Sequence, residues 1–207
     1  MAEKSKPSWR DVANALREHD YGKAELLALL SDLYKLSGDN RDFLHTRFSL
    51  GNDALGPYLK IINAAVYPEI EDRTDVRAAK QAISRYERAI GRADGRLELM
   101  FHFIERGHKN VIECGYADEG FFMALERMFD RVMVMLKAMS QAERISYQKR
   151  CEEIVEEVMD VGWGHYDYLL DAYAKVFPKE GAKLAAKCDA AWEAASQIKI
   201  IKLSCTS

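Results

Sequence analysis

Apolar side chains recur every three or four residues along almost the whole chain, which is the spacing of one face of an α-helix. The clearest stripe follows Asp118 and consists of Phe121, Leu125, Met128, Val132, Leu136 and Met139. A second stripe follows Thr74 or Asp75 and consists of Val76, Ala79, Ile83, Tyr86 and Ile90. Alternation with a period of two, which strands require, is nearly absent. The pattern therefore predicts an all-α protein.

The same spacing predicts about ten helices, packed as antiparallel hairpins in an irregular helical-repeat array or bundle. One helix is expected from about Lys23 to Ser37, with Leu26, Leu29, Leu30 and Leu33 on one face and Leu36 nearby. A helix is also expected to begin at Ser140 and to carry Tyr147, Cys151, Ile154, Val155 and Val158. Another carries Tyr166 to Phe177 and stops at Pro178, and an alanine-rich helix follows over about 180–196.

Length and composition suit one folded domain. The chain has 207 residues, of which 48% are hydrophobic and 30% charged, and its net charge is -3. These values are ordinary for a globular protein and differ from those of a disordered chain. We expect a disordered N-terminal tail at 1–7, a single helical domain at 8–197 and a C-terminal tail at 198–207. The tail could be a helix continuation, a docked tail or a lone strand.

Few features of the sequence indicate the cellular compartment of the protein. The segment Met1–Pro7 has no apolar core of the kind found in a signal peptide, and no segment approaches the ~20 apolar residues of a membrane helix. The four cysteines are scattered through the sequence, without a CxxC pair, so they predict reduced and mostly buried thiols. These features favour a cytoplasmic protein with no membrane contact.

The search for catalytic or metal-binding motifs yields one weak match. Glu105 and His108 form an ExxH pair on a predicted helix, with Glu98 and His102 near the same face. A di-metal carboxylate bundle needs two such pairs and two further glutamates, so neither a metal site nor another cofactor is expected. No nucleophile motif or glycine-rich phosphate loop occurs. The sequence therefore predicts no catalytic residues and favours a protein without enzymatic activity.

The most unusual local feature is the turn Gly162-Trp163-Gly164-His165, followed by aromatic and acidic residues. Free backbone N–H groups at a helix start can hold an anion, and Trp and Tyr are frequent binding anchors. Trp163, His165, Asp167 and Tyr168 are therefore candidate binding residues. The competing interpretation is structural: the glycines permit close helix packing, Trp163 fills the core, and His165 or Asp167 caps the helix.

Charge is segregated between helices. Residues 73–96 hold seven basic and three acidic side chains, and Arg77, Lys80 and Arg88 recur at near-helical spacing opposite the apolar stripe. A basic stripe can follow nucleic-acid phosphates, although it can equally be a solvated face or pair with an acidic helix. Such an acidic helix carries Glu152, Glu153, Glu156, Glu157 and Asp160.

The helix after Asp118 holds five of the eight methionines. Most of them fall on the apolar stripe and are expected in the core. Met123 and Met133 lie toward its edge, where flexible methionines could line a groove or a dimer contact.

Three stretches carry a resemblance to a known family. They are LLALLSDLYKLSGDNRDFLHTRF (Leu26 to Phe48), a middle stretch of Ala78 to Tyr86 followed by Leu97 to Phe103, and RCEEIVEEVMDVGWGHYDY (Arg150 to Tyr168). The chain resembles a bacterial all-helical family of unknown function over most of its length. The resemblance implies a helical-hairpin array and supplies no activity.

The leading hypothesis is a non-enzymatic helical scaffold that mediates protein–protein interaction with a partner or with a second copy of itself. One alternative is a nucleic-acid-associated accessory protein that uses the basic helix at 73–96. The other is an enzyme with an unrecognised site near Trp163 and His165.

Overall fold

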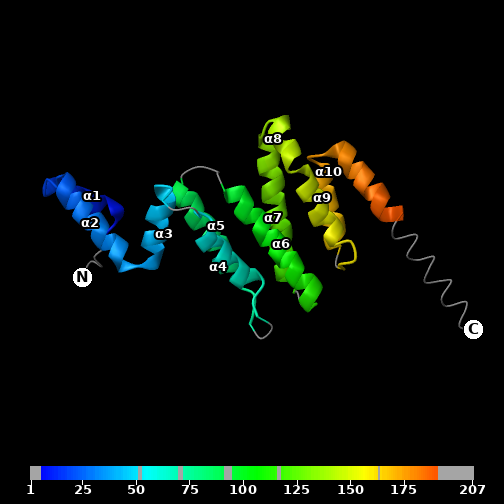
Figure 1. The fold of residues 1–207 in the computed structure, drawn as a ribbon, viewed down its shortest axis with the longest axis horizontal. Coiled ribbons are helices and arrows are strands. Elements are labelled where there is room, and N and C mark those ends of the chain that lie inside the picture. The colour runs from blue at the N-terminus through cyan, green and yellow to red at the C-terminus, as the bar shows by residue number, and fades with distance from the viewer. Residues whose placement is uncertain are drawn as a thin grey trace, which may run out of the picture. The chain divides into compact units, whose positions relative to one another are not determined.

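The computed structural model describes residues 6–50, 53–69, 72–90, 95–115, 118–162 and 164–190, and within these ranges the backbone is helical without strands. The prediction of an all-α fold is confirmed. Figure 1 shows the helices, which are α1 (Trp9–Glu18), α2 (Lys23–Leu36), α3 (Gly38–Arg47), α4 (Gly56–Val66), α5 (Val76–Ile90), α6 (Arg96–Cys114), α7 (Glu119–Ala138), α8 (Gln141–Ser146), α9 (Gln148–Glu157), α10 (His165–Ala174) and a helical segment at 178–190.

Internal contacts divide the chain into two units, an N-terminal unit, Met1–Ala54, and a C-terminal unit, Leu55–Ser207. Each unit is described by itself. The single domain expected at 8–197 stays a prediction. The tail expected at 198–207 and most of the tail expected at 1–7 lie outside the described residues. No helix in the described part of the chain has the length and apolar composition needed to cross a bilayer.

Capping side chains fix the ends of the helices in the N-terminal unit. The Ser8 backbone N–H donates to Asp11 Oδ2 at 2.7 Å, which forms part of a capping box for α1. Ser37, the single residue between α2 and α3, caps the N-terminus of α3. Its Oγ accepts a hydrogen bond from the Asn40 backbone N–H at 3.1 Å. Tyr34 Oη and His45 Nε2 lie 3.0 Å apart and join α2 to α3.

The core of the C-terminal unit is built around α6 and α7, which run antiparallel in Figure 1. Helix α6 also packs against α4, α5 and α9, and α7 packs against α10. The two central helices approach closely at Gly107, where an added Cβ would lie 2.4 Å from Leu125 Cδ2. A larger residue here would force the Leu125 side chain to move, which gives glycine a steric advantage at this crossing although it weakens a helix.

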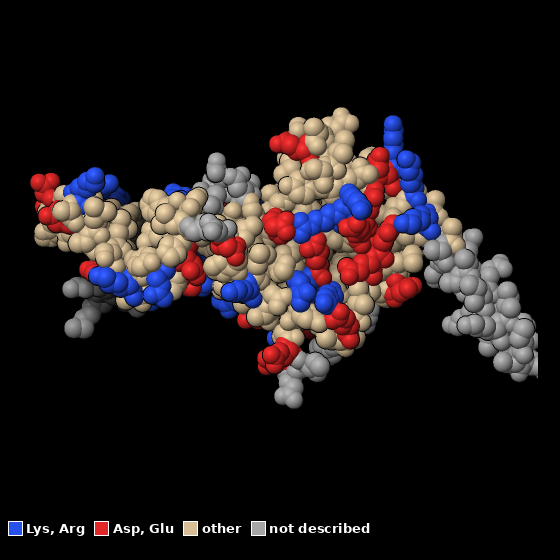
Figure 2. All heavy atoms as spheres, in the orientation of Figure 1, with Lys and Arg blue, Asp and Glu red and all other residues tan. Residues whose placement is uncertain are grey.

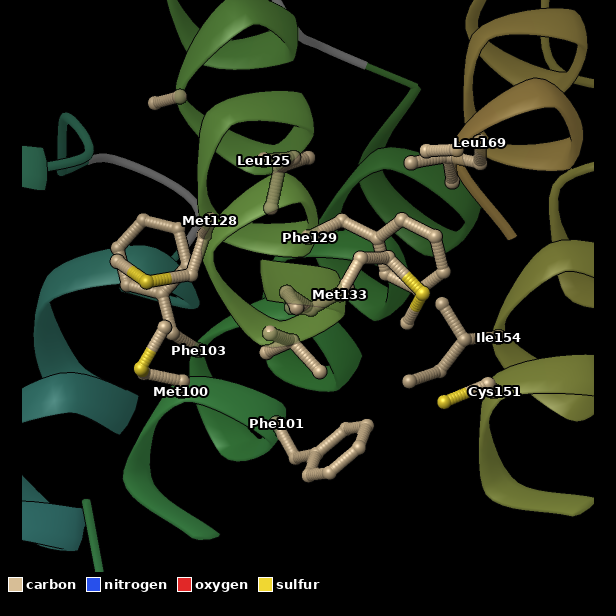
Figure 3. Packing of buried hydrophobic residues seen from close by; sticks show 14 of the residues in the cluster. Met100, Phe101, Phe103, Leu125, Met128, Phe129, Met133, Cys151, Ile154 and Leu169 are labelled. Atoms are coloured by element: carbon tan, nitrogen blue, oxygen red, sulfur yellow. The ribbon is translucent and has the colours of Figure 1, made fainter. Parts of the chain in front are cut away.

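The buried face of α7 matches its sequence stripe. Leu125, Phe129, Val132 and Leu136 are fully buried. In Figure 3, Phe129 and Met133 point toward Ile154 of α9 and Leu169 of α10. Met133, expected at the edge of the stripe, is only 4% exposed, whereas Met123 is 39% exposed.

Two helix boundaries differ from those expected. The helix that begins after Ser140 is divided at Tyr147 into α8 and α9. Ser146 contributes to this division because its hydroxyl donates to the Glu143 carbonyl at 2.6 Å, in competition with the helical backbone. Pro178 begins the helical segment at 178–190, where its fixed φ suits the first turn.

Candidate functional site

The unusual glycine turn starts α10 and separates the candidate binding residues. Gly164 adopts the left-handed conformation (φ 71°), and His165 is the first residue of α10. His165 is fully buried, whereas Asp167 is exposed and Tyr168 is 41% exposed. Trp163 lies outside the described residues. Of the three described residues, His165 therefore points into the unit while Asp167 and Tyr168 face solvent, and a binding role for any of the four candidates stays a prediction.

His165 belongs to a buried polar chain that crosses three helices. Its Nε2 lies 3.1 Å from Nε2 of His108 on α6, and its Nδ1 lies 3.0 Å from Glu126 Oε1 on α7. The two imidazole rings meet edge to face, with their centroids 5.2 Å apart, and both side chains are fully buried. Phe122 covers His165, with ring centroids 5.0 Å apart.

The hydrogen bonds select one protonation pattern. His165 Nδ1–H donates to the Glu126 carboxylate, so the neutral His165 ring accepts at Nε2. His108 must then donate from Nε2, which leaves its Nδ1 as an acceptor; this atom is buried without a hydrogen-bond partner. Burial, with a smaller contribution from His165, lowers the pKa of His108 to about 3. Burial also lowers the pKa of His165, against the opposing effect of Glu126.

This polar chain is suited to fixing helix positions. A substrate would need to reach a ring nitrogen, but both rings are inside the unit and three of their four nitrogens already have partners. A buried network of this kind favours one packing arrangement, because a shift of α6, α7 or α10 would break the two hydrogen bonds that it contains. We therefore interpret His108, His165 and Glu126 as a structural link between these helices.

Acidification is expected to destabilise the protein through this link. His108 stays neutral in the folded chain down to pH about 3, whereas in the unfolded chain it titrates near 6.5. Below pH 6.5 the unfolded chain binds a proton that the folded chain does not, so stability falls as pH decreases. Lowering the pH from 7.5 to 5.5 should reduce the free energy of unfolding by about 1–3 kcal/mol, because each pKa unit corresponds to about 1.4 kcal/mol. Urea unfolding followed by circular dichroism measures this loss.

The matched control is His19→Gln, which removes an exposed histidine of the N-terminal unit and should leave the loss unchanged. His108→Gln should reduce the loss of unfolding free energy between pH 7.5 and pH 5.5. An equal loss in His108→Gln and the unsubstituted chain would contradict the assignment.

Glu105 of the ExxH pair and the nearby Glu98 both bind Arg150. Arg150 of α9 donates from Nη1 and Nη2 to the two carboxylate oxygens of Glu98, at 2.6 and 2.9 Å. It also donates from Nη2 to Glu105 Oε2 at 2.9 Å, and its Cζ lies 4.4 Å from the centroid of the Phe101 ring. Among the described residues, no group of three or more His, Cys, Asp or Glu side chains is arranged to hold a metal ion. These carboxylates thus bind α9 to α6.

A hollow lies at the ends of α4 and α6. It measures about 850 Å³, and its described lining includes Tyr67, Arg106, Glu113 and Cys114. Arg106 lies over the Tyr67 ring, with its Cζ 4.4 Å from the centroid, and Tyr67 Oη donates to Glu113. Cys114 is an exposed free thiol. Tyr67, Arg106 and Glu113 are therefore engaged with one another.

Basic side chains gather where α5 and α7 face solvent. Lys80 lies close enough to Arg127 and Arg131 for electrostatic repulsion, and burial together with this repulsion lowers the pKa of Lys80. Arg77 and Arg88 are exposed, and Arg88 Nε donates to the Ser84 carbonyl at 3.3 Å. The basic stripe in the sequence indicates Lys80 but neither arginine, because both lie about fifty residues away in the sequence, on the outer side of α7.

Tyr168 reaches the same region from α10. Its Oη donates to Asp130 Oδ2 at 2.5 Å, and this bond, with burial, raises the pKa of Tyr168 to about 12. The positive charge of Arg127 opposes this rise in the pKa of Tyr168. Arg127 therefore lies within electrostatic range of both Tyr168 and Lys80. Two candidate binding residues from distant segments thus lie near one helix.

The N-terminal unit has a surface of a different kind. None of its described hydrophobic side chains is buried, and α3 supplies its one buried residue, Thr46. Its exposed large hydrophobic residues are Trp9, Val12, Tyr21, Leu26, Leu27, Leu29, Leu30, Leu33, Tyr34, Leu36, Phe43, Phe48 and Leu50. Figure 2 shows wide uncharged areas on α1–α3 between small groups of charged side chains. Exposed apolar surface of this extent is uncommon on a monomeric protein.

The chain matches no protein-family model, no curated protein and no solved structure. Its fold is all-helical. The resemblance to a bacterial family stays a prediction.

Proposed function

We propose that this protein is a non-enzymatic helical scaffold that mediates protein–protein interaction, and that its N-terminal helices bind a second copy of the chain. One observation supports the proposal: the described part of the N-terminal unit leaves thirteen large hydrophobic side chains exposed and buries none. Three short helices without a core are marginal in water, so contact with another surface would stabilise them.

The contact surface centres on what we call the α2 leucine face, Leu26, Leu29, Leu30, Leu33 and Leu36. Leu26, Leu29, Leu33 and Leu36 follow the alternating three- and four-residue spacing of a coiled-coil seam. These four side chains are between 39% and 76% exposed. Two heptads alone are too short for a stable coiled coil, so α1 and α3 are expected to contribute to the contact.

The exposed apolar area is sufficient for a dimer. Aromatic side chains bury roughly 150–250 Å² each and leucine or valine less, so the thirteen side chains, about half exposed, present on the order of 1,000 Å² in total. A standard interface buries about 800 Å² per partner. A second copy supplies the same surface, and an isologous contact between identical faces forms a closed dimer.

The described residues of the C-terminal unit offer no matching apolar surface. Their exposed large hydrophobics are Ile61, Ile112, Met123, Val134, Ile145 and Tyr168, which come from five different helices. Charge does not oppose pairing of two copies, because α1 and α2 each hold two basic and two acidic side chains. These features favour a second copy as the occupant of the α2 leucine face.

Sedimentation velocity across a hundredfold concentration range tests this proposal. The chain should approach twice its 23.6 kDa mass as its concentration rises. Leu29→Lys combined with Leu33→Lys should remain monomeric, because four lysines would meet in the apolar contact of the dimer. The matched control is Ile112→Lys, on a 46% exposed position of α6, which should still form dimers.

Two outcomes oppose the proposal. If the unsubstituted chain is monomeric at every concentration, a second copy does not bind the α2 leucine face. A monomer produced equally by Ile200→Lys with Ile201→Lys would assign the contact to the segment after residue 190.

The proposal includes the cytoplasmic location expected from the sequence, which the burial of Cys151 and Cys188 as free thiols supports. It also accommodates the resemblance to a bacterial family of unknown function, since that resemblance implies a helical array without an activity. No contact in the described structure favours the enzyme alternative near Trp163 and His165.

A further inference from the structure

A second surface lies on the outer side of α7 and differs in chemistry from the α2 leucine face. Met123, Arg127, Arg131 and Val134 are all exposed and, at 100° per residue, point within about a quarter turn of one another. Met123 is 39% exposed and Val134 is 69% exposed. We call these four residues the α7 outer face. Two arginines are thus bracketed along one helix by two apolar side chains.

The cations at this face have no carboxylate partners. Lys80, Arg127 and Arg131 form no ion pair with another described residue, whereas Lys109, Lys149, Lys175 and Lys187 each pair with a nearby carboxylate. The nearest acidic candidates on α7 are already engaged, since Asp130 accepts from Tyr168 and Glu126 bonds to His165. Lys80 is repelled by Arg127 and Arg131, and an anionic partner would relieve that repulsion.

Apolar exposure at the same place indicates the class of partner. Nucleic-acid phosphates would contact the arginines but would gain little from Met123 and Val134. A protein segment with acidic and apolar side chains on one side would contact all four residues. Tyr168, 41% exposed beside Arg127, adds an aromatic anchor of the kind enriched in protein interfaces.

We propose that the α7 outer face, flanked by Lys80 and Tyr168, is a protein-binding surface that receives an acidic amphipathic helix of a partner protein. The span from Met123 to Val134 is about 16 Å at 1.5 Å per residue, which matches three turns of a bound helix. The proposal does not depend on contact between copies through the α2 leucine face.

Binding of a synthetic probe to the full chain tests the proposal. The probe is a fluorescein-labelled helical peptide of four turns with glutamate and leucine on one side, and its binding is followed by anisotropy at low salt. The peptide should bind the unsubstituted chain. Arg127→Glu with Arg131→Glu should weaken binding at least tenfold, because attraction at both positions becomes repulsion.

The matched control is Lys149→Glu, which reverses an exposed cation of α9 that lies in a different part of the unit and should leave peptide binding unchanged. Equal circular dichroism spectra and melting temperatures confirm that the variants fold. Val134→Asp provides a second test, since it removes apolar contact without touching an arginine, and should also weaken binding.

Three results would overturn the proposal. They are absence of binding at millimolar peptide, equal binding by the double variant and the unsubstituted chain, and tighter arginine-dependent binding of a DNA duplex or single-stranded RNA than of the peptide. The last result would assign the surface to nucleic acid and support the accessory role predicted for the helix at 73–96.

Discussion

Phe129→Ala is expected to lower the free energy of unfolding of the C-terminal unit by about 3–5 kcal/mol. Phe129 is fully buried on α7 and points toward Ile154 and Leu169, so its removal leaves a cavity where three helices meet. The α6–α7 crossing at Gly107 is already close and restricts the movement that would fill this cavity. Thermal unfolding followed by circular dichroism should show a melting temperature lower by roughly 10 °C.

Val134→Ala is the matched control on the same helix. Val134 is 69% exposed, so its truncation should change the free energy of unfolding by less than about 0.5 kcal/mol. Comparable losses in Phe129→Ala and Val134→Ala would contradict the assignment of the buried face of α7.

Arg150→Ala is expected to destabilise the same unit by about 1–3 kcal/mol, because it leaves Glu98 and Glu105 on α6 without the cation that both bind. The expected loss of unfolding free energy is smaller than for a fully buried ion pair, because the Arg150 side chain is 28% exposed and that of Glu98 is 44% exposed. Chemical denaturation at neutral pH measures the loss. Arg150→Lys should recover part of it, since lysine keeps the charge without the planar, two-sided hydrogen bonding.

The pH dependence distinguishes lost charge pairing from lost packing against Phe101. Hydrogen bonds from Arg150 lower the pKa of Glu98, so the pair contributes stability above the ordinary carboxyl pKa and loses it as pH falls. The difference between the unsubstituted chain and Arg150→Ala should therefore shrink as pH falls from about 5 to about 3, across and below the ordinary carboxyl pKa. A difference that stays constant over this range would assign the effect to packing.

The helices could be predicted from the sequence because their signals are local. The apolar spacing after Asp118 and the caps at Ser8 and Asp118 act within one or two turns, and the structure places helices there. The division at Tyr147 could not be predicted, because the apolar pattern continues across it. The structure shows it in the backbone at Tyr147 and in the hydrogen bond from the Ser146 hydroxyl to the Glu143 carbonyl.

The sites depend on contacts between segments that are distant in the sequence. His165 attracts notice beside two glycines, but nothing near it indicates His108 or Glu126, which lie 57 and 39 residues away. Likewise, nothing near Lys80 in the sequence indicates Arg127. The leucines of α2 predict an apolar face, but a periodic pattern does not say what covers it, and the described residues show these leucines uncovered.

The absence of a buried hydrophobic side chain in the described part of the N-terminal unit has a consequence for amide hydrogen exchange. Backbone amides exchange through opening reactions whose free energy reflects the local contacts that must be broken. Amides of α6 and α7, inside the core, should exchange on the slow timescale of global unfolding. Amides of α1–α3 should exchange rapidly in dilute solution and become protected as concentration rises, so exchange mass spectrometry would locate the contact between copies along the sequence.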